Sequence, residues 1–97
     1  METVTPEQLV EIVKPYCIQK MLENTHKTNP FELDFDRLSS REMEERTEKV
    51  WALIDYINDP TPENRDAALY EIGDTINFLL FQAGKLLGLS DLVRGDP

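Results

Sequence analysis

Two pairs of acidic residues have the residue type and the spacing needed to bind a metal ion. Glu45 and Glu48 form one pair, Glu71 and Asp74 the other, and each pair is three positions apart. On a helix this spacing places both side chains on the same side, one turn apart. If the two helices that carry the pairs pack antiparallel, four carboxylates can converge on one point. Because like charges repel, such a cluster calls for a hard divalent cation.

Three helices are predicted to position these pairs. The first begins at Thr5-Pro6-Glu7-Gln8, with a Thr N-cap, Pro at the first helical position and Gln three residues after the cap. We expect it to end near Asn24-Thr25 and to be kinked or interrupted at Pro15. Residues 25–38 are predicted to form an extended connection with a turn at Asn29-Pro30. The apolar ladder of the first helix consists of Leu9, Val13, Cys17 and Met21.

The second and third helices are predicted to form an antiparallel hairpin, because the turn between them is short. The second is expected to begin at Ser39 or Ser40, where Ser39-x-x-Glu42 has the capping-box pattern, and to end before Asn58. The third begins at Thr61-Pro62-Glu63 and runs to about Leu87, with Gly88 as its stop. The predicted buried stripe of the second helix consists of Met43, Thr47, Val50, Ile54 and Ile57.

The two acidic pairs differ in their sequence context. Around Glu71 and Asp74 the third helix is apolar on most sides, so we expect it to be buried nearly all round and these carboxylates to be partly desolvated. In the second helix Glu42 and Glu45 have the same spacing as Glu45 and Glu48. Spacing alone therefore leaves open whether the second-helix pair is a site or a solvated acidic face.

Composition favours one small all-α domain over residues 1–97, a bundle of three main helices with a short C-terminal segment, completed by oligomerisation. The chain is 40% hydrophobic and carries a net charge of −9, which argues against binding nucleic acid or an anionic membrane. No transmembrane stretch or signal peptide is recognised, and Cys17 is the only cysteine. We therefore expect a cytoplasmic protein.

The sequence around the acidic pairs resembles the motifs of a known family. Residues 44–54 resemble the EExxE helix of the MazG-like nucleoside triphosphate pyrophosphohydrolases, and residues 71–80 resemble that family's E-[LI]-G-D helix. Residues 83–91 are similar to its A-x-x-x-L-G-[IL] ending, so the resemblance covers about residues 39–91. One position departs from the pattern, because many relatives carry a second Glu where this chain has Tyr70.

The resemblance implies an all-α, oligomeric, Mg²⁺-dependent enzyme that hydrolyses (deoxy)nucleoside triphosphates to the monophosphate and pyrophosphate. It implies that Glu45, Glu48, Glu71 and Asp74 bind the metal. An all-oxygen ligand set favours Mg²⁺, with Mn²⁺ as the alternative, over zinc. We assign Glu48 as the general base. The residues expected to contact substrate are Lys49 and Lys85 for the phosphates and Phe78 for the base.

Two other functions remain open, and both keep the helical fold. One is a pyrophosphohydrolase of the same fold that acts on phosphoribosyl-ATP. The other is a non-catalytic acidic adaptor that binds a basic protein partner, as the net charge of −9 would favour. The partners expected of the leading hypothesis are a nucleoside triphosphate substrate and further copies of the chain, in a homodimer or homotetramer.

Overall fold

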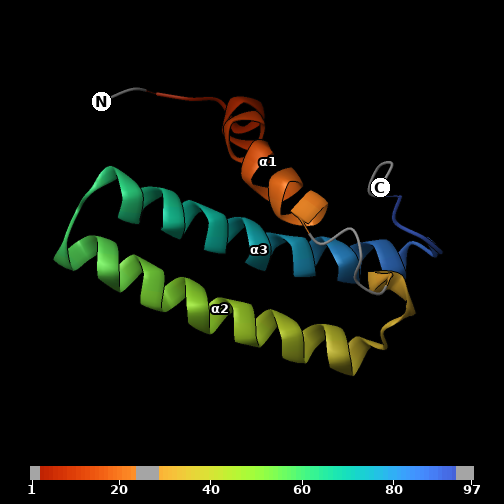
Figure 1. The fold of residues 1–97 in the computed structure, drawn as a ribbon. Helices are drawn as coiled ribbons and strands as arrows, with labels where there is room; N and C mark the ends of the chain where they lie inside the picture. The colour runs from red at the N-terminus through yellow and green to blue at the C-terminus, as the bar shows by residue number, and fades with distance from the viewer. Residues whose placement is uncertain (1–2, 24–28, 94–97) are drawn as a thin grey trace.

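The computed structural model describes residues 3–23 and 29–93, which form three α-helices and one 3₁₀ turn and contain no strand. The elements are α1 (Pro6–Glu23), η1 (Pro30–Glu32), α2 (Phe35–Asn58) and α3 (Pro62–Leu86). α2 and α3 lie side by side as an antiparallel hairpin, and α1 packs against the other side of α3 (Figure 1). The predicted all-α fold and hairpin are confirmed, with α3 as the central helix.

The helix starts at Thr5 and Thr61 are formed by the predicted capping interactions. The backbone N–H of Thr5 donates to Oε1 of Gln8 at 2.9 Å, and that of Gln8 donates to Oγ1 of Thr5 at 3.1 Å. At α3, Oγ1 of Thr61 accepts from the N–H of Asn64 at 3.1 Å. Gly88 follows α3 with φ of 79°, a left-handed conformation that costs glycine little. Local side-chain chemistry therefore determines these boundaries.

Two predictions about the helices need correction. α2 begins at Phe35, four residues before Ser39, because Oδ1 of Asp34 accepts a hydrogen bond of 2.7 Å from the N–H of Arg37 and caps the helix there. The predicted connection over residues 25–38 is therefore shorter and contains η1. α1 continues through Pro15 without interruption. The predicted end of α1 at Asn24-Thr25 lies outside the described residues.

α1 and α3 approach each other so closely that their backbones touch. A Cβ atom on Gly73 would lie 3.0 Å from the carbonyl carbon and oxygen of Tyr16. Beside this contact, Asn77 is 2% exposed and its Nδ2 donates to the carbonyl oxygen of Cys17 at 2.9 Å. The Tyr16 and Tyr70 rings meet edge to face with their centroids 5.5 Å apart. Glycine is required at position 73 because a larger residue would force the helices apart.

α2 is rotated relative to the sequence-based prediction. The side chains of its predicted buried stripe are exposed, Met43 at 60% and Ile57 at 74%, whereas Leu38 and Glu42 are buried. α3 is also not buried all round, because its Leu79 and Leu80 are about half exposed. The surface of the single chain is therefore unusually apolar. None of the described helices combines the length and apolar character needed to cross a membrane.

Candidate metal centre

Three carboxylates from the two helices of the hairpin meet between α2 and α3. Glu45 from α2 and Glu71 and Asp74 from α3 each offer one oxygen, and these oxygens all lie within 4.8 Å of one another. All three side chains are partly buried, which confirms the expected desolvation of Glu71 and Asp74. The antiparallel hairpin thus brings both predicted acidic pairs to one place.

Two oxygens of this cluster lack a partner. Oε2 of Glu45 and Oε2 of Glu71 are shielded from solvent and accept no hydrogen bond within the described part of the chain. A buried carboxylate oxygen without a partner is costly, since it has lost its hydration. A divalent cation would supply the missing interaction, and an oxygen-only ligand set suits Mg²⁺ or Mn²⁺. The residues present therefore fit a metal ion.

The electrostatics of the cluster reflect this crowding. Burial, together with the neighbouring carboxylates of Asp74 and Glu48, raises the pKa of Glu45 to about 8. Burial also raises the pKa of Glu71, although the ammonium of Lys20 acts in the opposite direction. Without a cation, Glu45 therefore retains near neutral pH a proton that an isolated carboxyl group would have lost. A bound divalent ion would displace it.

Glu48 lies at the edge of the cluster. It is exposed, and it is not one of the three residues whose oxygens meet. Its carboxylate nevertheless contributes to the raised pKa of both Glu45 and Glu71. The structure thus brings three of the four predicted ligands together and leaves the fourth beside them, the residue to which we assign the general base.

The three predicted substrate contacts lie at different distances from the cluster. Lys49, half-buried, is one helical turn after Glu45 on α2. Phe78 is one turn after Asp74, but its ring packs against Phe81, with centroids 5.4 Å apart, and under the guanidinium of Arg41.

Lys85 is the most remote of the three. Along α3 it lies about 16 Å beyond Asp74, at 1.5 Å per residue. Its Nζ donates to the carbonyl oxygen of Phe31 at 3.0 Å and lies 5.5 Å from the Phe35 ring centroid. Lys85 therefore ties α3 to η1 and the start of α2, away from the cluster.

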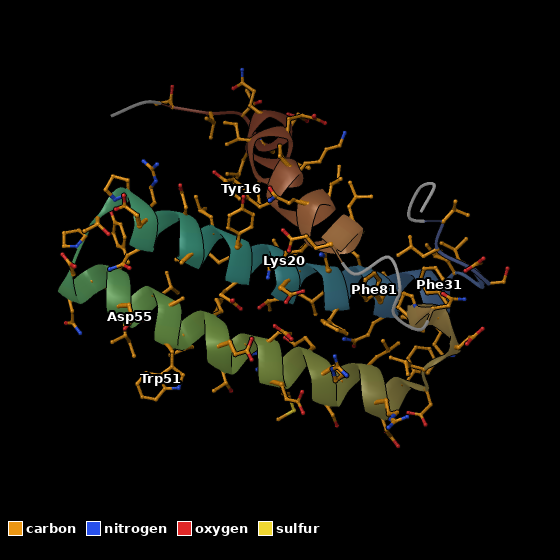
Figure 2. All side chains as sticks on the ribbon, in the orientation of Figure 1. Tyr16, Lys20, Phe31, Trp51, Asp55 and Phe81 are labelled. Carbon is orange, nitrogen blue, oxygen red and sulfur yellow. The ribbon has the colours of Figure 1, made fainter. Side chains whose placement is uncertain are left out.

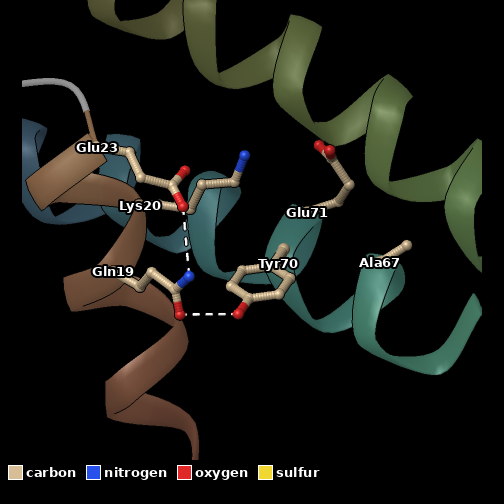
Figure 3. A pocket seen from close by; sticks show the side chains of 6 residues that line it. All are labelled: Gln19, Lys20, Glu23, Ala67, Tyr70 and Glu71. Carbon is tan, nitrogen blue, oxygen red and sulfur yellow. Dashed lines mark hydrogen bonds between the residues drawn. The ribbon is translucent and has the colours of Figure 1, made fainter. Parts of the chain in front are cut away.

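A pocket of about 260 Å³ opens next to the cluster, between α1 and α3 (Figure 3). Its rim contains a hydrogen bond of 2.7 Å in which the hydroxyl of Tyr70 donates to Oε1 of Gln19. Glu71 belongs to both the pocket and the carboxylate cluster. The lining residues are Gln19, Lys20, Glu23, Ala67, Tyr70 and Glu71.

The sequence-based reasoning did not find the α1 residues of this pocket. Lys20 lies three residues after Cys17, on the side of α1 that packs on α3, and this helical spacing was available in the sequence. Tyr70 had been noticed only as a departure from the family pattern. What the sequence did not contain was the direction in which α1 crosses α3.

Comparisons with protein-family models, with curated proteins and with solved structures find no match to this chain. The resemblance to MazG-like enzymes therefore depends on the motif residues between positions 39 and 91 and stays a prediction. What stands independently of it is an all-α structure whose three carboxylates form a candidate metal site.

Proposed function

We propose that this protein is a Mg²⁺-dependent nucleotide pyrophosphohydrolase, which hydrolyses (deoxy)nucleoside triphosphates to the monophosphate and pyrophosphate. One observation carries the proposal. Glu45, Glu71 and Asp74 converge within 4.8 Å from two antiparallel helices, and two of their buried oxygens lack partners among the described residues. These are also three of the four positions at which the resemblance to MazG-like enzymes implies metal ligands.

The chain supplies distinct groups for such a reaction. Glu45, Glu71 and Asp74 would hold Mg²⁺, with Mn²⁺ as the alternative. The bound ion supplies positive charge for the phosphates and makes a water molecule more acidic. Glu48, which is exposed on α2, would accept the proton of an attacking water. Lys49 on α2 and Lys20 on α1 add positive charge on the two sides of the cluster, as a triphosphate requires.

Pyrophosphate release from a full panel of ribo- and deoxynucleoside triphosphates tests the proposal. The wild-type protein should release pyrophosphate from at least one of them when Mg²⁺ is present and none when it is chelated. Asp74→Asn should lower kcat/KM at least about 100-fold, because metal polarisation contributes several kcal/mol to such reactions. Glu44→Gln, an exposed neighbour outside the cluster, is the matched control and should retain activity.

The same panel separates the alternatives. Phosphoribosyl-ATP is included, and turnover of that compound alone would assign the second enzymatic function. An acidic adaptor would release no pyrophosphate, and calorimetry would show no specific Mg²⁺ or Mn²⁺ binding. The partial burial of the three carboxylates argues against the adaptor, which requires its charges on exposed surfaces. As part of the proposal we expect a homodimer or homotetramer.

A further inference from the structure

The outer face of α2, directed away from α3, carries an apolar surface that none of the residues described by the structure covers. Six large apolar side chains between positions 43 and 57 are exposed on α2. Figure 2 shows the largest of them, Trp51, pointing away from α3 on the outer side of the helix, and it is 63% exposed. The six residues are Met43, Val50, Trp51, Leu53, Ile54 and Ile57.

The size of this face matches what a pair of chains needs. From their exposed fractions, the six side chains present roughly 600 Å² in one chain, so two copies that covered them completely would bury about 1,200 Å², which reaches the lower limit for a stable, specific interface. Single exposed apolar residues need no explanation, but six of them along one side of a helix, with only Arg46 and Thr47 between them, mark an interaction site. An aromatic residue at its centre, Trp51, is typical of interface hot spots.

The apolar positions are symmetric along the helix. Met43 lies seven residues before Val50 and Ile57 lies seven residues after it. If a second α2 packs antiparallel with a two-fold axis beside Val50, Met43 of each chain lies next to Ile57 of the other, and Val50 lies next to its own copy. An interface with two-fold symmetry requires a surface that is complementary to itself in this way.

We propose that the outer face of α2 is a homodimer interface, in which α2 packs antiparallel against α2 of a second copy of this chain. The one cation at the edge of the face supports an apolar contact, because Arg46 is directed back to the buried Glu42. Its Nε lies 3.1 Å from Oε1 and its Nη2 lies 2.6 Å from Oε2 of that residue. The charge of Arg46, whose side chain is 57% exposed, is thereby paired within the chain.

A second copy fits this face better than a membrane does. The same stretch of α2 also carries three exposed carboxylates, those of Glu44, Glu48 and Asp55. The whole chain has a net charge of −9. Anionic lipid would repel such a surface. Contact with the exposed apolar residues of α1 or α3 in another copy would be head-to-tail and would extend into larger assemblies, whereas α2 on α2 closes as a pair.

The proposed interface and the carboxylate cluster lie on different sides of α2. Glu45 faces α3 on the inner side of α2, and the proposed interface occupies the opposite side. Each copy therefore keeps its own cluster, with no residue contributed across the pair. Loss of the dimer and loss of metal binding are consequently separable by experiment, so this inference, which locates the homodimer expected above, stands without the proposed hydrolytic activity.

Sedimentation velocity over a wide concentration range tests the dimer. The wild-type chain should sediment at twice the monomer mass, and emission from Trp51, the only tryptophan in the chain, should shift to shorter wavelength as dimer forms. Val50→Glu should raise the dissociation constant by roughly 100-fold or more, since it places two unpaired carboxylates face to face. Val50 is 45% exposed in the single chain, so the variant should remain helical.

Leu79→Glu is the matched control, because Leu79 is equally exposed, at 50%, but lies on α3. It should leave the dimer intact. A wild-type chain that is monomeric at every concentration would overturn the proposal. So would a Leu79→Glu variant that dissociates as readily as Val50→Glu, or an assembly whose mass keeps rising with concentration.

Disulfide cross-linking in a Cys17→Ala background tests the orientation of the two helices. Val50→Cys should cross-link to its own copy. Met43→Cys alone should not, because its two copies would lie about 20 Å apart along antiparallel helices, far beyond disulfide reach. A mixture of Met43→Cys and Ile57→Cys chains should cross-link. Efficient cross-linking of Met43→Cys alone would instead show parallel helices and refute the proposed arrangement.

Discussion

The two interfaces of α3 are built in opposite ways. Against α1, α3 presents Gly73 and Asn77, whose small size and hydrogen bond let the backbones touch. Against α2, it presents Glu71 and Asp74, whose charges face the further carboxylate of Glu45. At the first interface Nδ2 of Asn77 is bonded to Cys17, and Oδ1 of the same neutral amide lacks a partner among the described residues. The second gathers three carboxylates, and two of their buried oxygens lack partners among the described residues.

The convergence of three carboxylates, rather than the mere presence of an unpaired polar atom, makes the α2–α3 interface the better candidate for a cation site. Buried polar groups are normally satisfied, so unpaired carboxylate oxygens are a reason to look for an absent partner. The α1–α3 contact holds α3 in place, and in doing so it fixes the direction in which Glu71 and Asp74 point. The stability of one interface should therefore be independent of Mg²⁺, and that of the other should depend on it.

The largest expected effect concerns the α1–α3 contact. Gly73→Val should lower the free energy of unfolding by about 3 kcal/mol, because its Cβ would lie 3.0 Å from the backbone of Tyr16 and helix backbones cannot yield locally. Urea unfolding followed by circular dichroism measures the loss. Ala83→Val, at an exposed position of α3, is the control for the lower helix propensity of valine and should lose less than about 1 kcal/mol. Equal losses in the two variants would contradict the tight contact.

The next effect concerns the metal. Mg²⁺ at about one hundred times its dissociation constant should stabilise the wild-type chain by roughly 2.7 kcal/mol, visible as a higher Tm. Asp74→Asn should remove most of this gain, since it replaces one of the three clustered carboxylates. Asp66→Asn, on the same helix but outside the cluster, should keep it. A Tm that does not respond to Mg²⁺ in the wild-type chain would remove the metal site.

A smaller effect concerns pH. The folded-state pKa of Glu45 is raised from 4.5 to about 8, so this group stabilises the metal-free fold fully below about pH 4.5 and loses that contribution as pH rises to 8. Glu45→Gln should therefore flatten the decline in unfolding free energy between pH 5 and pH 8 in the presence of a chelator. Because the side chain is only partly buried, solvent screening makes the change smaller than that caused by Mg²⁺.

Addition of Mg²⁺ at pH 8 should make the unfolding free energy of the wild-type chain larger than that of Glu45→Gln, the reverse of the order expected with a chelator. The wild-type chain then gains from metal binding by the ionised carboxylate, whereas Glu45→Gln does not. Glu44→Gln, one residue away and exposed, is the control and should follow the wild type in both conditions. If Glu44→Gln flattened the pH profile as much as Glu45→Gln, the origin of the pH dependence would lie outside the cluster.

The smallest effect concerns the pocket rim. Tyr70→Phe removes the hydroxyl that donates to Gln19 at 2.7 Å and should cost no more than about 1 kcal/mol, because water replaces an exposed hydrogen bond. The Mg²⁺-dependent rise in Tm should remain unchanged. A variant that lost that response would show that the rim and the cluster are energetically coupled, and the two interfaces would then not be independent.

The parts of the fold that depend on local chemistry were predicted well. Thr5 and Thr61 begin their helices because a hydroxyl and a nearby N–H are only three residues apart, so the sequence contains everything needed. The predicted start of α2 is wrong because two local capping patterns compete there. Asp34 caps it by an identical local interaction, but Ser39 with Glu42 three residues later has the stronger capping-box pattern.

The rotation of α2 could not be read from its own residues. Its apolar stripe has a clear helical period, and burial within the chain was the ordinary expectation. The structure instead turns Glu45 toward α3 and leaves Val50 and Ile57 outside. Periodicity shows which residues share a face but does not name the element that covers it. The cluster was predictable in part because the spacing of each acidic pair is visible in the sequence. The position of Lys20 beside the cluster was not, because it depends on the direction in which α1 crosses α3.

Gly73 and Asp74 are consecutive residues, and this has a consequence for how the chain can vary in length. Adjacent positions on a helix point about 100° apart, which is why one of them meets α1 and the other meets α2. A single-residue insertion or deletion in the middle of α3 would turn everything beyond it by that angle, so both interfaces would lose their register beyond that point. Length changes can therefore be tolerated in the turn at Asp59–Thr61 but not around Gly73.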